Sequence, residues 1–212
     1  MSTAGYVACS VFCYFKISVK LMQISETDSL TFPDCYAVNI TKPENKRRTN
    51  MENKALVVID LQNDITKNYK LIIERVNTAI DWASENDMRV IYIKHFNLSE
   101  KTRTFKPGSK GAELVPELNV VSEDIFEKSK ASALTCEAFS NFIENNEIKE
   151  FYIAGADATG CVKSTSYNLA KIGYKVNVIS DCVTSYDLRK LPEMYEYYAQ
   201  KGCNVLTLAE CK

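Results

Sequence analysis

The chain from position 51 onward alternates short apolar runs with stretches of helical spacing. The first run, ALVVI at residues 55–59, is apolar throughout, as expected for a strand covered on both faces. Over residues 69–85 apolar side chains recur at steps of three or four, which predicts an amphipathic helix. This alternation predicts an α/β fold: a Rossmann-like, three-layer α/β/α sandwich around a six-stranded, mainly parallel sheet.

Later segments continue the pattern. Further strands are predicted at residues 90–93, 124–127, 151–154, 176–179 and 205–208. Helices are predicted between them, and the one that begins at Cys161 is expected to end at Gly173. The segment between residues 96 and 123 is rich in loop residues, so we predict a surface loop with at most one helical turn.

The first fifty residues differ in composition from the rest. Residues 6–15 are apolar but too few to span a bilayer, and no basic residue precedes them as a secretory signal requires, so no membrane partner is predicted. A weak leader peptide is the alternative for this stretch. Residues 25–50 are polar, with a short basic run that is typical of a linker. We predict a poorly ordered N-terminal extension at 1–50 and a compact domain at 51–212. An extra strand or helix packed on that domain is the alternative for the apolar part.

Charge and cysteine content exclude several classes of function. With 26 basic and 27 acidic residues and no long basic block, the chain is not expected to bind nucleic acid. The eight cysteines are scattered without a CxxC pair and His95 is the sole histidine, so neither a metal site nor a cofactor is predicted. Several cysteines lie in apolar strand or helix patterns, which favours a reduced, cytoplasmic chain.

Three reactive side chains follow three of the predicted strands. Asp60 follows the first, Lys128 the third and Cys161 the fourth. Ligands of open α/β sheets bind outside the carboxyl ends of the strands, so these side chains are expected at one edge. Cys161 also lies where a helix begins, and the unpaired N–H groups there favour a thiolate. An aspartate can take the thiol proton, and a lysine can stabilise both anions.

Each of these residues also has an ordinary structural interpretation. Cys161 could be an inert buried thiol, Asp60 a turn or cap residue, and Lys128 a solvated surface lysine. Lys130 is a second candidate for the lysine, and we prefer Lys128 because it is closer to the strand end.

Two polar residues near the same edge are candidates for substrate binding. His95 follows the second strand and is either a substrate-orienting residue or a hydrogen-bonded structural histidine. Gln62 lies two residues after Asp60 and could contact the substrate in the same way. No GxSxG elbow is present, which disfavours Ser-His-Asp catalysis.

Several segments of the domain resemble the isochorismatase-like, or cysteine hydrolase, superfamily. They are KALVVIDLQND at 54–64, GAELVPEL and FEKSKASAL within 111–134, and AGADATGCVKSTSYNLAKIGYKVNVISDCVTS at 154–185. The resemblance covers residues 51–212 and implies the family's fold, a six-stranded parallel sheet between helices. It also implies catalytic roles for Asp60, for Lys128 as the lysine of KxxxSA, and for Cys161.

The resemblance further implies a cis peptide bond between Ala156 and Asp157. The backbone N–H of Asp157 would then form an oxyanion hole with that of Cys161. The implied activity is that of a cysteine hydrolase, or amidase, which cleaves a C–N bond of a small-molecule amide, carbamoyl or ureido substrate through a thioester. Relatives that cleave the vinyl ether of isochorismate do not depend on a thiol, so Cys161 favours C–N hydrolysis. A non-catalytic binding or scaffold protein with this fold is the alternative.

One family feature is missing from the sequence. Nicotinamidases of the superfamily bind a metal through an aspartate and two or more histidines, with a DxH arrangement after the second strand. Here those positions read Lys94, His95, Phe96 and Asn97, which disfavours a metal-dependent nicotinamidase. The resemblance also implies a homo-oligomer, either a dimer or a tetramer.

Overall fold

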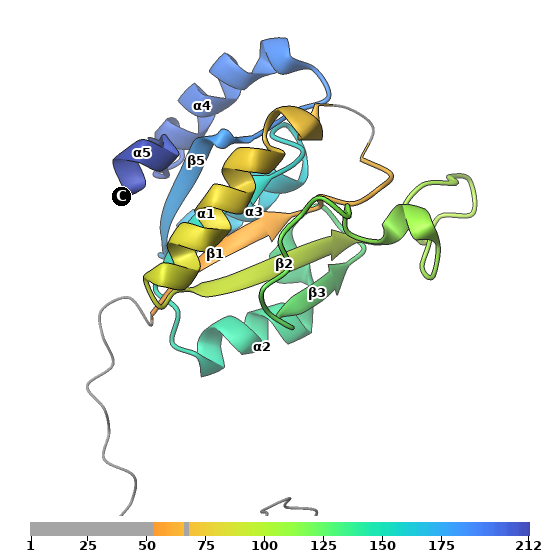
Figure 1. The fold of residues 1–212 in the computed structure, drawn as a ribbon, viewed down its shortest axis with the longest axis horizontal. Helices are drawn as coiled ribbons and strands as arrows, with labels where there is room; N and C mark the ends of the chain where they lie inside the picture. The colour runs from red at the N-terminus through yellow and green to blue at the C-terminus, as the bar shows by residue number, and fades with distance from the viewer. Residues whose placement is uncertain (1–52, 66–67) are drawn as a thin grey trace, which may run out of the picture. The chain divides into compact units, whose positions relative to one another are not determined.

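The computed structural model describes residues 53–65 and 68–212 (Figure 1). The extension predicted at residues 1–50 lies outside these ranges. The strands are β1 (Lys54–Ile59), β2 (Arg89–His95), β3 (Ile125–Lys128), β4 (Glu150–Gly155), β5 (Lys175–Val183) and β6 (Asn204–Leu206). The α-helices are α1 (Ile73–Glu85), α2 (Glu137–Asn145), α3 (Cys161–Lys171), α4 (Leu191–Gln200) and α5 (Leu208–Cys211). Short 3-10 turns are η1 (Tyr69–Leu71), η2 (Lys110–Ala112), η3 (Ala133–Thr135) and η4 (Leu188–Lys190).

The six strands form one sheet in the order β3-β2-β1-β4-β5-β6, and every neighbouring pair is parallel. The predicted α/β class and six-stranded parallel sheet are therefore confirmed. Strand order reverses between β1 and β4, which is the place where open α/β sheets bind ligands.

Successive residues of β1 face opposite layers of the sandwich. Leu56 and Val58 pack in one core cluster with residues of α1 and α5. Ala55, Val57 and Ile59 pack in the other with residues of α2, α3 and α4. Figure 1 shows α1 lying across one face of the sheet. Both faces of β1 are buried, which explains why its sequence is apolar throughout.

Two helical elements differ from the sequence prediction. The helix predicted over 69–85 is interrupted at Ile72, so a 3-10 turn precedes α1. The short helix α5 is absent from the prediction, although Thr207 and Glu210 form a capping box at its start. No helix in residues 53–65 and 68–212 is both long and apolar enough to cross a membrane. The five cysteines of this part of the chain, at 136, 161, 182, 203 and 211, are all free.

Candidate active site

Asp60 is held at the carboxyl end of β1 by both neighbouring strands. Its N–H donates to the carbonyl of Ile93 in β2 over 2.9 Å. The N–H of Ala156, just after β4, donates to the carbonyl of Ile59 over 2.9 Å. Asp60 has a φ of 53°, in the left-handed region that aspartate adopts more readily than most residues. These bonds place its carboxylate where the strand order reverses.

The end of β4 approaches β1 too closely for any side chain. A Cβ built on Gly155 would lie 2.1 Å from the carbonyl oxygen of Ile59, and φ of Gly155 is +113°. Gly155 also pairs with Val183 across a register shift, so β5 extends beyond the predicted 176–179. The glycine therefore allows the segment after β4 to lie beside Asp60.

A tight turn connects β4 to α3. Its Ala156–Asp157 peptide bond is cis, as the family resemblance implies. The Asp157 carboxylate accepts hydrogen bonds from the N–H and hydroxyl of Thr159, from the Ser185 hydroxyl and from the N–H of Tyr186. These bonds fix the turn against the segment that follows β5, and so fix the start of α3.

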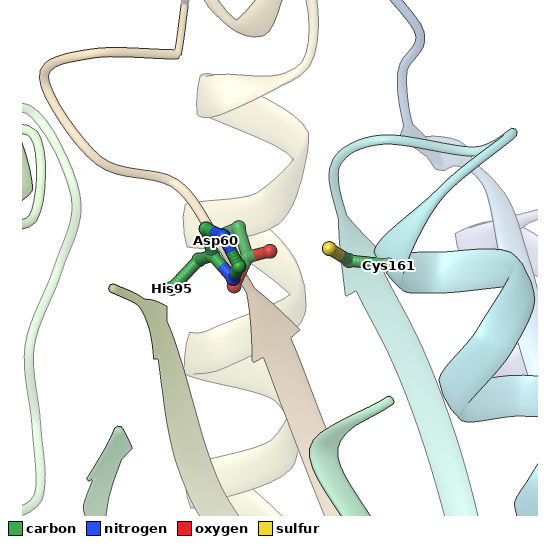
Figure 2. Close-up of side chains that lie close together, drawn as sticks. All are labelled: Asp60, His95 and Cys161. Atoms are coloured by element: carbon green, nitrogen blue, oxygen red, sulfur yellow. The ribbon is translucent and has the colours of Figure 1, made fainter. Parts of the chain in front are cut away.

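Lys128, the last residue of β3, joins the predicted catalytic side chains. Its Nζ lies 2.8 Å from Asp60 Oδ2 and 3.1 Å from Cys161 Sγ. The side chain of Lys128 is 0% exposed and that of Asp60 is 5% exposed, so this ion pair is buried. Cys161 is half-buried, and Figure 2 shows its sulfur directed toward Asp60. Lys130, the second candidate lysine, is exposed to solvent.

His95, the last residue of β2, completes the surroundings of the lysine. Its Nδ1 lies 3.4 Å from Lys128 Nζ. Its ring packs edge-on against Phe105, with ring centroids 5.7 Å apart. Figure 2 places the ring beside Asp60, with Cys161 opposite. Four side chains from three strand ends and one helix start therefore meet at one edge of the sheet.

The comparisons with known proteins agree with this fold. Residues 54–210 match the family model described as the isochorismatase domain. The chain belongs to the isochorismatase family. This isochorismatase-family chain is 24% identical over 209 residues to nicotinamidase of Escherichia coli (strain K12), covering 76% of the chain and 97% of that protein.

Two solved structures share the fold of this isochorismatase-family chain. Pyrazinamidase of Pyrococcus horikoshii in complex with zinc superposes with a TM-score of 0.67 at 21% identity, covering 74% of this chain and 99% of that one. N-carbamoylsarcosine amidase from Thermoplasma acidophilum superposes with a TM-score of 0.64 at 19% identity, covering 73% and 95% of the two chains. At these identities the likeness concerns the fold.

Burial dominates the protonation of the site. It raises the pKa of the Asp60 carboxyl, against the opposing charge of Lys128. Burial, followed by the charge of Asp60, raises the pKa of the Cys161 thiol to about 12, although Lys128 again opposes the change. The start of a helix alone therefore does not make Cys161 a thiolate, because burial and the neighbouring carboxylate of Asp60 raise the pKa of the thiol. The raised pKa favours the thiol form of Cys161 in the resting site.

One ammonium group faces two groups that can each carry a negative charge. Because an unpaired charge is costly in buried surroundings, the favoured states have one negative charge to match Lys128. Either Asp60 is a carboxylate and Cys161 a thiol, or the proton has moved to Asp60 and Cys161 is a thiolate. This transfer leaves the net charge unchanged and removes the Asp60 charge that disfavours the thiolate.

The amides predicted to form an oxyanion hole are free of main-chain partners. Within the described ranges, neither the N–H of Asp157 nor that of Cys161 donates to a backbone carbonyl. In the next residues of α3, the N–H of Val162 donates to the carbonyl of Asp157 and the N–H of Ser164 to that of Gly160. Both amides are thus available to a substrate oxygen, and the oxyanion hole stays a prediction.

Gln62 holds the backbone around His95. Its Nε2 donates to the carbonyls of His95 and Ala112 over 3.0 and 2.7 Å, and its Oε1 accepts from the N–H of His95 over 2.7 Å. The residue is buried, with an exposed fraction of 0%. These bonds give Gln62 a positioning role, while direct contact with a substrate stays a prediction for both residues.

Asp64 anchors the long loop after β2, a role that the sequence does not predict. Its Oδ2 accepts from the N–H of Phe105 over 2.7 Å. A Cβ on Gly111 would lie 2.1 Å from the same oxygen, so the loop approaches Asp64 closely at a second point. Phe105 is 41 positions away from Asp64, and no local sequence pattern reveals such a contact.

The one cluster of potential metal ligands in the described part of the chain already surrounds a cation. Ligand atoms of Asp60, His95 and Cys161 lie within 4.8 Å of one another. The Nζ of Lys128 lies within 3.4 Å of an atom of each of the three. The ammonium group therefore takes the place a metal ion would need, and these residues do not fit a metal.

Proposed function

We propose that this chain hydrolyses the C–N bond of a small-molecule amide, carbamoyl or ureido compound, with Cys161 as the nucleophile. The observation that carries the proposal is one buried ammonium, that of Lys128, 2.8 Å from Asp60 Oδ2 and 3.1 Å from Cys161 Sγ. A base, a nucleophile and a cation that stabilises both are the groups that thioester chemistry requires.

In the first half of the reaction, Asp60 takes the thiol proton and the sulfur of Cys161 attacks the substrate carbonyl carbon. The C–S bond forms and the carbonyl oxygen becomes an oxyanion, which the N–H groups of Asp157 and Cys161 bind. Asp60 then gives the proton to the nitrogen as the C–N bond breaks. Ammonia or an amine leaves, and a thioester remains on Cys161.

In the second half, water attacks the thioester and Asp60 accepts a proton from that water. The C–S bond breaks, the acid product leaves, and Asp60 returns the proton to Cys161. Lys128 stays charged throughout, so every step has one negative charge to balance it. The buried surroundings strengthen this electrostatic stabilisation.

The names of two relatives support amide chemistry. They are nicotinamidase of Escherichia coli and N-carbamoylsarcosine amidase of Thermoplasma acidophilum. The ammonium of Lys128 among Asp60, His95 and Cys161 supports a reaction that runs on these side chains without a metal. Amides and carbamoyl compounds are therefore the substrate classes to test first.

Ammonia release from a panel of primary amides and ureides tests the proposal. Cys161→Ala is expected to reduce turnover by roughly 10,000-fold or more, as the loss of a nucleophile does in other hydrolases. Cys211→Ala is the matched control, because Cys211 is also a free, half-buried thiol but lies in α5. Full activity in Cys161→Ala would refute the proposal. Binding of an amide to the wild-type chain without turnover would favour the non-catalytic alternative.

A further inference from the structure

The Lys128 ammonium has a third hydrogen that the proposed reaction leaves unused. An ammonium has three N–H bonds and accepts no hydrogen bond. Two of the three have partners in Asp60 Oδ2 at 2.8 Å and Cys161 Sγ at 3.1 Å. The remaining polar neighbour is His95 Nδ1 at 3.4 Å. Because the lysine can only donate, Nδ1 must be the acceptor, and the imidazole is then neutral with its proton on Nε2.

Gln62 fixes the backbone of His95, and this sets where the ring lies. Gln62 binds both the N–H and the carbonyl of His95, at 2.7 and 3.0 Å. Phe105 packs edge-on against the ring at a centroid distance of 5.7 Å. Burial, and then the charge of Lys128, lowers the pKa of His95 against the opposing charge of Asp60. The lowered pKa favours the neutral ring that an acceptor role requires.

We propose that His95 is a positioning residue that acts through Lys128: its Nδ1 accepts the third N–H and so orients the other two toward Asp60 and Cys161. Without this acceptor, the buried ammonium has an unpaired hydrogen and can turn away from the sulfur. The thiolate of Cys161 then loses part of its stabilisation. The inference rests on the proposed function only in taking Cys161 as the reactive thiol.

Three variants separate this role from simple packing. His95→Leu removes the acceptor. His95→Asn restores a carbonyl oxygen near the position of Nδ1. Phe105→Leu removes the aromatic neighbour of the ring but no side-chain hydrogen bond. The measurement is the rate of iodoacetamide alkylation of Cys161 in the full chain, across the neutral and alkaline range. It is followed on the Cys161 peptide by mass spectrometry, because Cys136 and Cys211 are also half-buried.

His95→Leu is expected to slow alkylation about tenfold at neutral pH and to move its pH profile upward by about one unit. His95→Asn should recover most of the rate, and Phe105→Leu should keep the wild-type profile. An unmoved profile in His95→Leu, or a His95→Asn variant as slow as His95→Leu, would overturn the positioning role. Alkylation does not depend on hydrolysis of an amide substrate. A moved alkylation profile together with an inactive amide panel would therefore support this role while counting against the amidase proposal.

Discussion

Lys128 Nζ and Asp60 Oδ2 form an ion pair over 2.8 Å between side chains that are 0% and 5% exposed. Removing one partner leaves an uncompensated buried charge, which is more destabilising than loss of the pair itself. Lys128→Met is therefore expected to lower the free energy of unfolding by about 3–5 kcal/mol. Urea denaturation of both single variants and of Asp60→Asn/Lys128→Met measures the coupling. The double variant should lose less stability than the two single losses added together, whereas simple addition would contradict a coupled pair.

Gly155 is expected to tolerate no side chain. Gly155→Ala should reduce stability by about 2–4 kcal/mol, because its Cβ overlaps the Ile59 carbonyl and φ is positive, and activity should fall as Asp60 shifts. Gly173→Ala is the control, since Gly173 also has a positive φ but no atom within 4 Å of the added Cβ. That variant should lose only about 1 kcal/mol, from backbone conformation alone. If the two variants lose equal free energy of unfolding, then β1 leaves room for a side chain at position 155, which contradicts the close approach of β4 to β1.

Gln62 is expected to matter through the backbone that it holds. Gln62→Met keeps the length of the side chain but leaves the half-buried N–H of His95 without its acceptor and removes both donors of the buried Gln62 amide, which should cost about 2 kcal/mol of stability. Asn63 is adjacent to Gln62 in the sequence, and Asn63→Ala removes only an exposed side-chain hydrogen bond to the carbonyl of Lys110, so this variant should lose much less stability. Thermal unfolding of the two variants provides the comparison. A Gln62→Met chain as stable as the wild type would exclude the positioning role.

The dependence of kcat/KM on pH should show a broad plateau. The reactive site has one proton between Asp60 and Cys161. Binding of a second proton inactivates the site at low pH, and this limb should lie above pH 3.8 because burial raises the pKa of Asp60. Loss of the shared proton inactivates the site at high pH, and this limb should lie well above pH 9.0 because the pKa of Cys161 is raised to about 12. A rate that declines between neutral pH and pH 9.0 would contradict this assignment.

The element order and the meeting of three side chains at one edge could be predicted from the sequence. Apolar runs mark each strand locally, and parallel strands bring their carboxyl ends to the same side. Asp60 directly follows β1, Lys128 ends β3, and Cys161 begins the helix after β4. Topology alone therefore places the three residues near one another.

The electrostatics of the site could not be predicted in the same way. Lys128 and Asp60 are 68 positions apart, and Lys128 lies 33 positions from both His95 and Cys161, so their contacts exist only in the folded chain. The local rule for a cysteine at a helix start favours a thiolate, whereas burial beside Asp60 favours the thiol. Gln62 likewise looks like a substrate contact by position, and only the fold reveals that its bonds go to the backbone.

The central claim is that Cys161 forms a covalent acyl intermediate, and acid quenching during turnover tests it most directly. With an amide that the chain hydrolyses, peptide mass spectrometry should find the acyl group of the substrate on Cys161 and on no other cysteine, and Cys161→Ala should release no ammonia. Sustained turnover by Cys161→Ala, with no acyl adduct on the wild-type residue, would contradict the claim.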